Sequence, residues 1–151
     1  MFVDSSAFLA ILGNRSDAAL LVEKIKGSRK QCKTSASVRL DVVMALAGSR
    51  ADKRGASAEA VEQATEIFDN LLHILKVYEI AVSPRIAADG CRLAARFGQQ
   101  ADHPAKLTVQ TCLALAAAES LRLPVLHSNP AIDRITEQDW TAWRIGEGRA
   151  G

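Results

Sequence analysis

Short apolar runs alternate with longer helical segments along this chain, and this alternation constrains its fold more than any other feature. Segments that we expect to be strands occupy residues 1–3, 32–35, 77–82, 125–126 and 143–145, the last as a final edge strand. Helical spacing, or helix start and stop signals, mark residues 5–12, 16–27, 38–47, 57–75, 84–97 and 108–121. Strands that alternate with helices of this length need crossover connections, which give a mainly parallel sheet covered by helices. We therefore predict an α/β fold, a three-layer α/β/α sandwich with a sheet of about five strands.

Two helical segments differ in how much of their surface we expect to be buried. Residues 38–47 are almost all apolar, so we expect protein to cover this helix on most sides and Gly48 to end it. Residues 57–75 carry one apolar stripe and acidic residues in the first turns, which is typical of an amphipathic helix.

The composition indicates one globular domain, which we place at residues 1–151. Of these 151 residues 48% are apolar and 24% are charged, which excludes a disordered or fibrous chain. The formal net charge of +2 is too small to indicate a nucleic-acid or membrane partner by itself. The three cysteines form no CxxC pair, and no apolar stretch approaches the ~20 residues of a membrane span. We therefore expect a cytoplasmic protein that is neither exported nor membrane-bound.

Two aspartates lie where a parallel sheet commonly binds ligands. Asp4 follows the first strand, and side chains beyond the carboxyl ends of parallel strands line the binding crevice of such folds. Asp4 is also a favourable N-cap for the next helix, and the two roles can coexist. Asp41 lies in the apolar segment 38–47, where a carboxylate is seldom left without a partner. It pairs with a distant basic residue, emerges at the helix end, or belongs to a site.

A local basic segment precedes Asp41. Between Glu23 and Asp41 the chain has no acid but six cations, namely Lys24, Lys26, Arg29, Lys30, Lys33 and Arg39. Cations at this density can follow a phosphate backbone while nearby acids hold a metal. A solvated helix end and loop is the commoner role of such a segment, so both interpretations stay open.

Other motifs add little. His73, His103 and His127 lack zinc-binding spacing and are interpreted as structural, with His127 the candidate exception because it follows a strand. The sequence contains no phosphate loop, dinucleotide glycine pattern or GxSxG elbow. Trp140 and Trp143 fit packing near the C-terminus better than base stacking.

Three segments carry a family resemblance. They are Met1-Phe2-Val3-Asp4-Ser5-Ser6-Ala7, then Thr34-Ser35-Ala36 ahead of Asp41, then His103-Pro104-Ala105-Lys106-Leu107 leading into Cys112-Leu113-Ala114. In this order and spacing they resemble PIN-domain toxins of the VapC type, and the likeness extends from residue 1 to about residue 136. The resemblance implies a three-layer α/β fold, a homodimer, a cognate antitoxin and an endoribonuclease activity that depends on Mg²⁺ or Mn²⁺.

The resemblance also assigns residues to a metal site. In that family, acids at the carboxyl edge of the sheet hold the cation, because hard divalent ions favour oxygen ligands and negative charge. The cation activates water for attack on a phosphodiester. The first family acid corresponds to Asp4, and the second, usually Glu, corresponds to Asp41. The third and fourth acids correspond to Thr111 and Asn129, which are neutral.

Further residues have supporting roles by the same resemblance. Thr108 replaces an Asn that usually precedes the third acid, and Ser6 and Ser35 are expected to support the site. The candidate RNA contacts are Lys30, Lys33 and Arg39. Asp102 or Asp133 would have to replace a missing acid from a spacing that the family does not use.

Three hypotheses follow from these assignments. The first is a VapC-like ribonuclease with a reduced site, whose metal affinity falls because two negative charges are missing. The second is an inactive PIN-like protein that binds antitoxin or RNA. The third is an unrelated α/β domain that uses the same crevice for an organic ligand or a regulatory partner, and it would gain support from Asp4 and Asp41 on opposite sides of the sheet.

Overall fold

A parallel sheet forms the centre of the fold, as seen in a computed structural model that describes residues 1–49 and 55–146. The sheet has the strand order β3-β2-β1-β4, and all its pairings are parallel. The strands are β1 (Phe2–Val3), β2 (Cys32–Ser35), β3 (Val77–Ile80) and β4 (Val125–Leu126). The predicted mainly parallel sheet is confirmed, with four strands in the described residues against the expected five or so.

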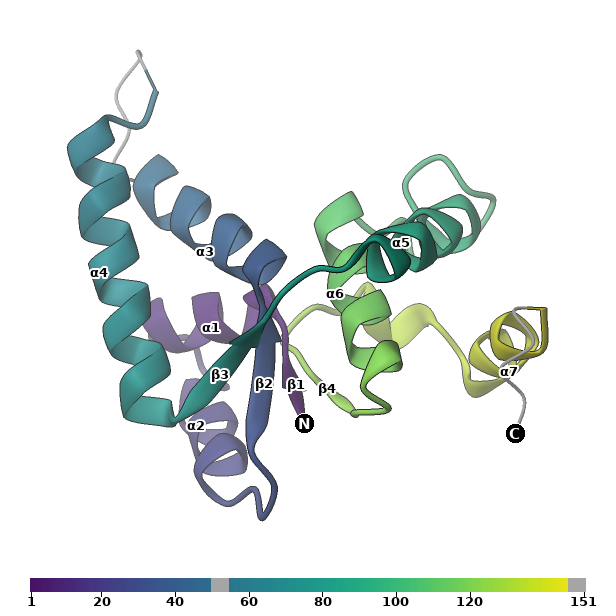
Figure 1. The fold of residues 1–151 in the computed structure, drawn as a ribbon, viewed down its shortest axis with the longest axis horizontal. Coiled ribbons are helices and arrows are strands. Elements are labelled where there is room, and N and C mark those ends of the chain that lie inside the picture. The colour runs from purple at the N-terminus through teal and green to yellow at the C-terminus, as the bar shows by residue number, and fades with distance from the viewer. Residues whose placement is uncertain (50–54, 147–151) are drawn as a thin grey trace.

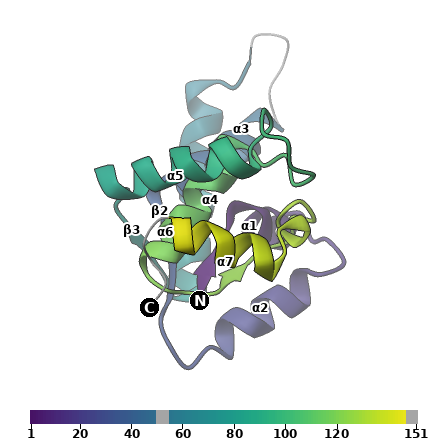
Figure 2. The same cartoon turned by 90° about the vertical axis from the view of Figure 1, so that its right-hand side faces the viewer.

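Helices cover the sheet on both sides (Figure 1). They are α1 (Ser5–Leu12), α2 (Ala18–Lys26), α3 (Ala36–Gly48), α4 (Ala58–Leu75), α5 (Pro84–Phe97), α6 (Val109–Ser120) and α7 (Glu137–Gly146), with a 3₁₀ turn η1 (Ile132–Arg134) before α7. Helices α1 to α4 lie on one side, and α5 to α7 on the other. In the perpendicular view, α7 lies in front with α5 above it (Figure 2). The arrangement confirms the three-layer α/β/α sandwich.

The helices begin where the sequence supplies capping side chains. A side-chain oxygen accepts a hydrogen bond from a first-turn backbone N–H in five helices, through Asp4, Ser35, Ser57, Ser83 and Thr108. Such a bond satisfies one of the donors that a helix leaves unpaired at its N-terminus. Because Asp4 directly follows β1 and Ser35 is the last residue of β2, α1 and α3 both start at the carboxyl edge of the sheet.

The core extends through both layers of helices. Phe8 of α1 and Phe68 of α4 are fully buried and meet edge to face, with ring centroids 5.0 Å apart. On the other side, α6 is buried over most of its length, as its Ala- and Leu-rich sequence predicts. Its packing against α5 is close at Gly90, where an added Cβ would lie 3.1 Å from a methyl carbon of Leu113.

Two expectations about individual elements are wrong. Residues 143–145 belong to α7 and form no edge strand. Helix α7 begins with a reciprocal pair in which Thr136 N donates to Asp139 Oδ2 at 2.8 Å and Asp139 N donates to Thr136 Oγ1 at 3.2 Å. This capping box stabilises a helix start that β-prone residues further along do not reveal.

The second correction concerns α3, which is less covered than its apolar sequence suggested. Leu40 and Met44, one turn apart, are 57% and 46% exposed. Gly48 is the last residue of the helix, and Ser49 is the C-cap. An apolar helix therefore leaves an apolar strip at the surface of the chain.

Gly98 and Gly48 provide a matched test of backbone packing. A Cβ at Gly98 would lie 2.3 Å from Ala94 O, whereas nothing described lies within 4 Å of a Cβ at Gly48. We expect Gly98→Ala to lower the free energy of unfolding by about 1–3 kcal/mol, because the end of α5 must move. Gly48→Ala should raise it by about 0.5–1 kcal/mol, since glycine is a poor helix residue. Urea denaturation of both variants measures these changes. Equal changes in the free energy of unfolding would show that Gly98 is not packed against Ala94 O at the end of α5.

Candidate functional site

Asp4 is a buried carboxylate at the end of β1, with 1% of its surface exposed. Its Oδ2 accepts hydrogen bonds from Ser6 N at 3.0 Å and from Ser6 Oγ at 2.5 Å. Its Oδ1 is buried and accepts no hydrogen bond from any described residue. Burial raises the pKa of Asp4 above its ordinary value, although hydrogen bonds from Ser6 and Ser5 oppose the rise. Asp4 is therefore both an N-cap and a carboxylate with one oxygen available to a ligand.

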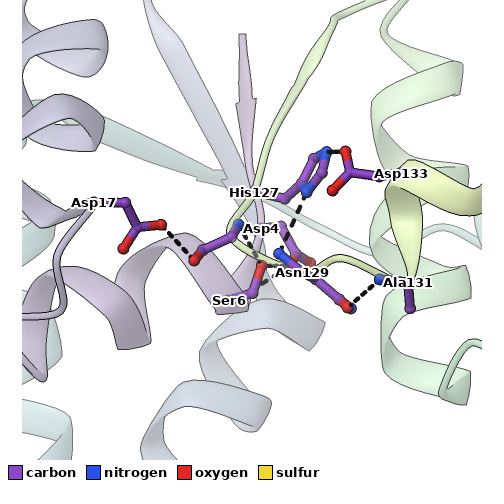
Figure 3. Close-up of polar contacts among 8 residues, drawn as sticks. Asp4, Ser6, Asp17, His127, Asn129, Ala131 and Asp133 are labelled. Carbon is purple, nitrogen blue, oxygen red and sulfur yellow. Dashed lines mark hydrogen bonds and ion pairs between the residues drawn. The ribbon is translucent and has the colours of Figure 1, made fainter.

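A chain of hydrogen bonds connects Asp4 to the loop after β4 (Figure 3). Ser6 Oγ, which donates to Asp4, accepts a bond from Ser128 N at 3.1 Å. Ser128 Oγ in turn donates to Asp17 Oδ2 at 2.5 Å. Two sequence-distant segments, the loop after β4 and the start of α2, thus hold the surroundings of Asp4 in place. Ser6 therefore bridges Asp4 and the backbone of Ser128.

Asp41 lies on α3, is half-buried, and is close enough to Asp4 for its charge to add to the rise in the pKa of Asp4. Within the described part of the chain Asp41 has no ion-pair partner, so it does not pair with a distant basic residue there. The third hypothesis, which would gain support from Asp4 and Asp41 on opposite sides of the sheet, gains none from this proximity.

Thr111 lies in the first turn of α6 and is 5% exposed. Its backbone N–H donates to Thr108 Oγ1 at 3.1 Å, and the two hydroxyl oxygens lie 2.9 Å apart. Thr108 is thus the N-cap of α6, and Ser35 is the N-cap of α3 through a longer bond of 3.5 Å from Val38 N. These contacts assign a structural role to both supporting residues.

Asn129 and the residues around it form a compact turn after β4. Asn129 Oδ1 accepts a bond from Ala131 N at 3.0 Å, and Asn129 N donates to His127 Nδ1 at 3.3 Å. His127 Nε2 lies 3.7 Å from Asp133 Oδ1, and the Asp133 side chain is 71% exposed (Figure 3). The amide oxygen of Asn129 therefore already has a donor within the turn.

The basic segment divides between two places. Arg39 makes ion pairs with Asp69, at 2.6 Å, and with Glu79. The hydrogen bond with Glu79 is the main cause of the raised pKa of Arg39, so its charge is neutralised within the fold. Lys30 and Lys33 lie elsewhere, in the loop before β2 and at the start of that strand. These two lysines lie toward the amino ends of the parallel strands, whereas Asp4 lies at the carboxyl ends.

The predicted residues do not gather enough acidic or His/Cys ligands for a complete metal centre in the described part of the chain. Among residues 1–49 and 55–146, no group of three or more His, Cys, Asp or Glu side chains could hold a metal ion. Asp102 is exposed in the loop before α6, and Asp133 is directed to His127. The buried, unpartnered Asp4 Oδ1 beside a second carboxylate nevertheless fits a hard divalent cation, which favours oxygen ligands.

A cleft of about 1220 Å³ lies between α5, α6, β4 and α7, and neither Asp4 nor Asp41 lines it. His127 and Asp133 contribute to its walls, whereas Asp4, Asp41, Thr111 and Asn129 do not belong to its lining. The four family positions thus do not converge on this cavity.

Asp17 is the site neighbour that sequence reasoning missed. The segment Ser16-Asp17 reads as a helix N-terminus, and Asp17 is the N-cap of α2 by position. Its side chain makes no capping bond and instead accepts from Ser128 Oγ. Nothing in the sequence around Asp17 indicates this contact, because Ser128 is far away along the chain.

A parallel sheet with a buried carboxylate at its carboxyl edge, and a second carboxylate on α3, is an arrangement of the open α/β class, in which this edge commonly binds ligands. No family model matches the chain. A curated protein named a VapC ribonuclease, from Rhizobium meliloti (strain 1021), is 29% identical over 129 residues, covering 83% of this chain and 91% of that protein. The crystal structure of Mycobacterium tuberculosis VapC20, titled a sarcin-ricin loop cleaving toxin, superimposes with a TM-score of 0.57 at 16% identity. That match covers 93% of this chain and 92% of VapC20.

These relatives confirm the resemblance to PIN-domain toxins of the VapC type that was found in the sequence. Among the described residues, no helix is long and apolar enough to cross a membrane.

Proposed function

We propose that this chain is a VapC-type endoribonuclease, the toxin of a toxin–antitoxin pair, that uses Mg²⁺ or Mn²⁺ held by Asp4 and Asp41. The observation that carries the proposal is the buried Asp4 Oδ1, which lacks a donor within the described residues and lies near the Asp41 charge. A buried carboxylate oxygen in such a position is costly unless a cation or a donor compensates it.

The side chains around Asp4 have distinct tasks in this proposal. Ser6 fixes Asp4 by donating to Oδ2, which leaves Oδ1 for the cation. Asp41 supplies the second negative charge, while Thr111 and Asn129 offer neutral oxygens. When bound, the cation would neutralise charge on the phosphate and lower the pKa of water for attack on the phosphodiester. Because only two carboxylates contribute, we expect weak metal binding.

A cognate antitoxin and a homodimer are part of the proposal through the family resemblance. The apolar strip of Leu40 and Met44 on α3 supports a protein partner, because soluble surfaces seldom expose large apolar side chains side by side. A second copy of the chain and an antitoxin are both consistent with it.

The second candidate is a PIN-like protein that binds RNA or antitoxin without hydrolysis. A specific observation favours it: the Thr111 hydroxyl is bonded to Thr108, and the Asn129 oxygen accepts from Ala131 N. Both neutral oxygens already have partners in the described structure, so the cation would have fewer ligands than the family site offers.

A cleavage assay distinguishes the candidates. We expect the purified chain to cleave structured RNA in Mn²⁺, and Asp4→Asn to reduce the rate at least roughly 100-fold, since even indirect ligand contacts change activity 10- to 100-fold. Asp102→Asn is the matched control, because it removes the same charge from an exposed loop. Equal cleavage by wild type and Asp4→Asn would contradict the assignment. RNA binding without cleavage by the wild type would establish the second candidate.

A further inference from the structure

A second groove opens at the end of the sheet opposite to Asp4, with a volume of about 480 Å³. The C-terminal end of α2, the loop into β2, the last turn of α4 and the start of β3 form its walls. Figure 1 shows these segments together at the lower left of the molecule, away from the carboxyl ends of the strands. Since parallel strands β2 and β3 both start here, the groove lies at the amino edge of the sheet.

The groove is strongly basic. Four cations line it, namely Lys26, Arg29, Lys30 and Lys76, and no acid belongs to the lining. In the part of the chain that the structure describes, none of the four makes an ion pair. The nearest acid in β3, Glu79, is bound by Arg39. These four charges are therefore uncompensated and available to an anionic ligand.

An aromatic ring and apolar side chains complete the groove. Tyr78 is 50% exposed, and Ile74 is 64% exposed, both unusual for large apolar groups. Lys33, the cross-strand partner of Tyr78, places its Nζ 5.3 Å from the ring centroid. Positive charge beside an exposed aromatic ring is the combination by which proteins bind single-stranded nucleic acid, with cations on phosphates and a base on the ring.

The backbone at Lys76 is unusual, as it is at three other non-glycine residues of the described chain. Lys76 is the C-cap of α4 in the left-handed conformation, with φ 53°. Glycine or asparagine usually occupies this position, because a Cβ is unfavourable there. A lysine that accepts this strain directs a fourth cation into the groove.

We propose that this groove is a binding site for the backbone and bases of single-stranded RNA, separate from the Asp4 site. The choice of RNA as the anion rests on the proposed function. An acidic peptide would use the cations but would have no need for the exposed ring of Tyr78. A four-residue strand spans about 13 Å, so RNA held here reaches the carboxylates only through several further nucleotides. The groove thus selects and orients a substrate at a distance from the bond that is cut.

The test measures RNA binding without cleavage. Fluorescence anisotropy of a short labelled single-stranded RNA is recorded with the full chain in EDTA, so the result does not depend on hydrolysis or on a metal. Loss of two phosphate contacts in Arg29→Gln/Lys30→Gln should reduce the log–log salt slope by about 1.4 and weaken binding roughly 25-fold at about 0.1 M salt. Lys24→Gln is the matched control, because Lys24 lies on α2 outside the lining.

Two further variants test the groove in other ways. One distinguishes weaker RNA binding from a loss of stability, and the other distinguishes base stacking from the effect of charge. Lys76→Gly removes a groove cation and relieves the left-handed strain, so binding should weaken about 5-fold while the melting temperature stays equal or rises. Tyr78→Leu should weaken binding roughly 5-fold or more without changing the salt slope, through lost stacking.

Three results would overturn the proposal. One is equal weakening by Lys24→Gln and by the double variant, which would show an unspecific charge effect. Another is unchanged binding in Tyr78→Leu. The third is competition by polyglutamate as strong as by unlabelled RNA, which would assign the groove to an acidic polypeptide. Because cleavage is absent from the assay, failure of the ribonuclease proposal leaves these outcomes interpretable.

Discussion

The double variant Thr111→Asp/Asn129→Asp is expected to bind Mn²⁺ roughly 10- to 100-fold more tightly than the wild type and to cleave RNA faster. Each substitution adds a negative oxygen ligand at a position where the family carries an acid, and divalent-ion affinity rises with the number of carboxylates. Isothermal titration with Mn²⁺ and the cleavage assay measure the two effects.

The local structure accepts both substitutions. Position 111 is in the first turn of α6, three residues after the N-cap Thr108, where an acid is favourable for the helix dipole and the cap. At position 129 an aspartate can accept from Ala131 N as Asn129 does. Without metal the double variant should be less stable than the wild type, because it adds negative charge near buried Asp4.

Thr111→Asn with Asn129 unchanged is the neutral control for this prediction. It changes the shape of the site without adding charge, so neither metal affinity nor activity should rise. If the double aspartate variant binds Mn²⁺ no better than this control, positions 111 and 129 do not face the same cation as Asp4.

Asp4→Asn is expected to stabilise the metal-free fold at neutral pH although it removes activity. Burial raises the pKa of Asp4, so the ionised form is less favourable in the folded chain than in the unfolded chain. Asparagine keeps an oxygen for the N-cap bond and carries no charge. We expect a gain of at least about 1 kcal/mol, equivalent to roughly 2–4 °C in melting temperature.

The pH dependence has a definite sign. Below the ordinary Asp pKa of 3.8, Asp4 is protonated in both states and imposes no penalty. As pH rises from there through the raised pKa of the folded state, the wild type loses stability relative to Asp4→Asn. The difference is therefore smallest in acid and becomes constant once the pH exceeds the raised pKa of Asp4 in the folded state. Calorimetry of both proteins across this range, with Asp102→Asn as the charge control, tests it.

Metal should reverse the order of stability. At a Mn²⁺ concentration 100 times its dissociation constant, binding adds about 2.7 kcal/mol to the wild type and nothing to a variant that cannot bind. A wild type that stays less stable than Asp4→Asn in saturating Mn²⁺ would show that Asp4 is not a ligand. A variant less stable at every pH would show that the carboxylate acts mainly as a cap.

Local signals predicted most of the fold correctly. The strand–cap–helix sequences at Asp4 and Ser35 and the amphipathic segment of α4 all depend on residues close together in the sequence. The error at α7 also has a local origin, because Trp143 and its neighbours favour strands by type. Two contacts stabilise a helix here instead. Trp140 packs against Phe97 with ring centroids 5.9 Å apart, and Thr136 caps the first turn of α7.

The sequence alone determined the order of elements and the parallel sheet, because its strand-like segments alternate with helices long enough for crossover connections. Only the tertiary structure decided how the charges are distributed. Strand β2 separates Lys30 from Arg39, so one basic segment ends at two edges of the sheet, with Arg39 neutralised by Glu79. The fold also brings Asp17 to Ser128, and Lys76 to Lys30. Such contacts depend on chain segments that meet only after folding, and no local pattern encodes them.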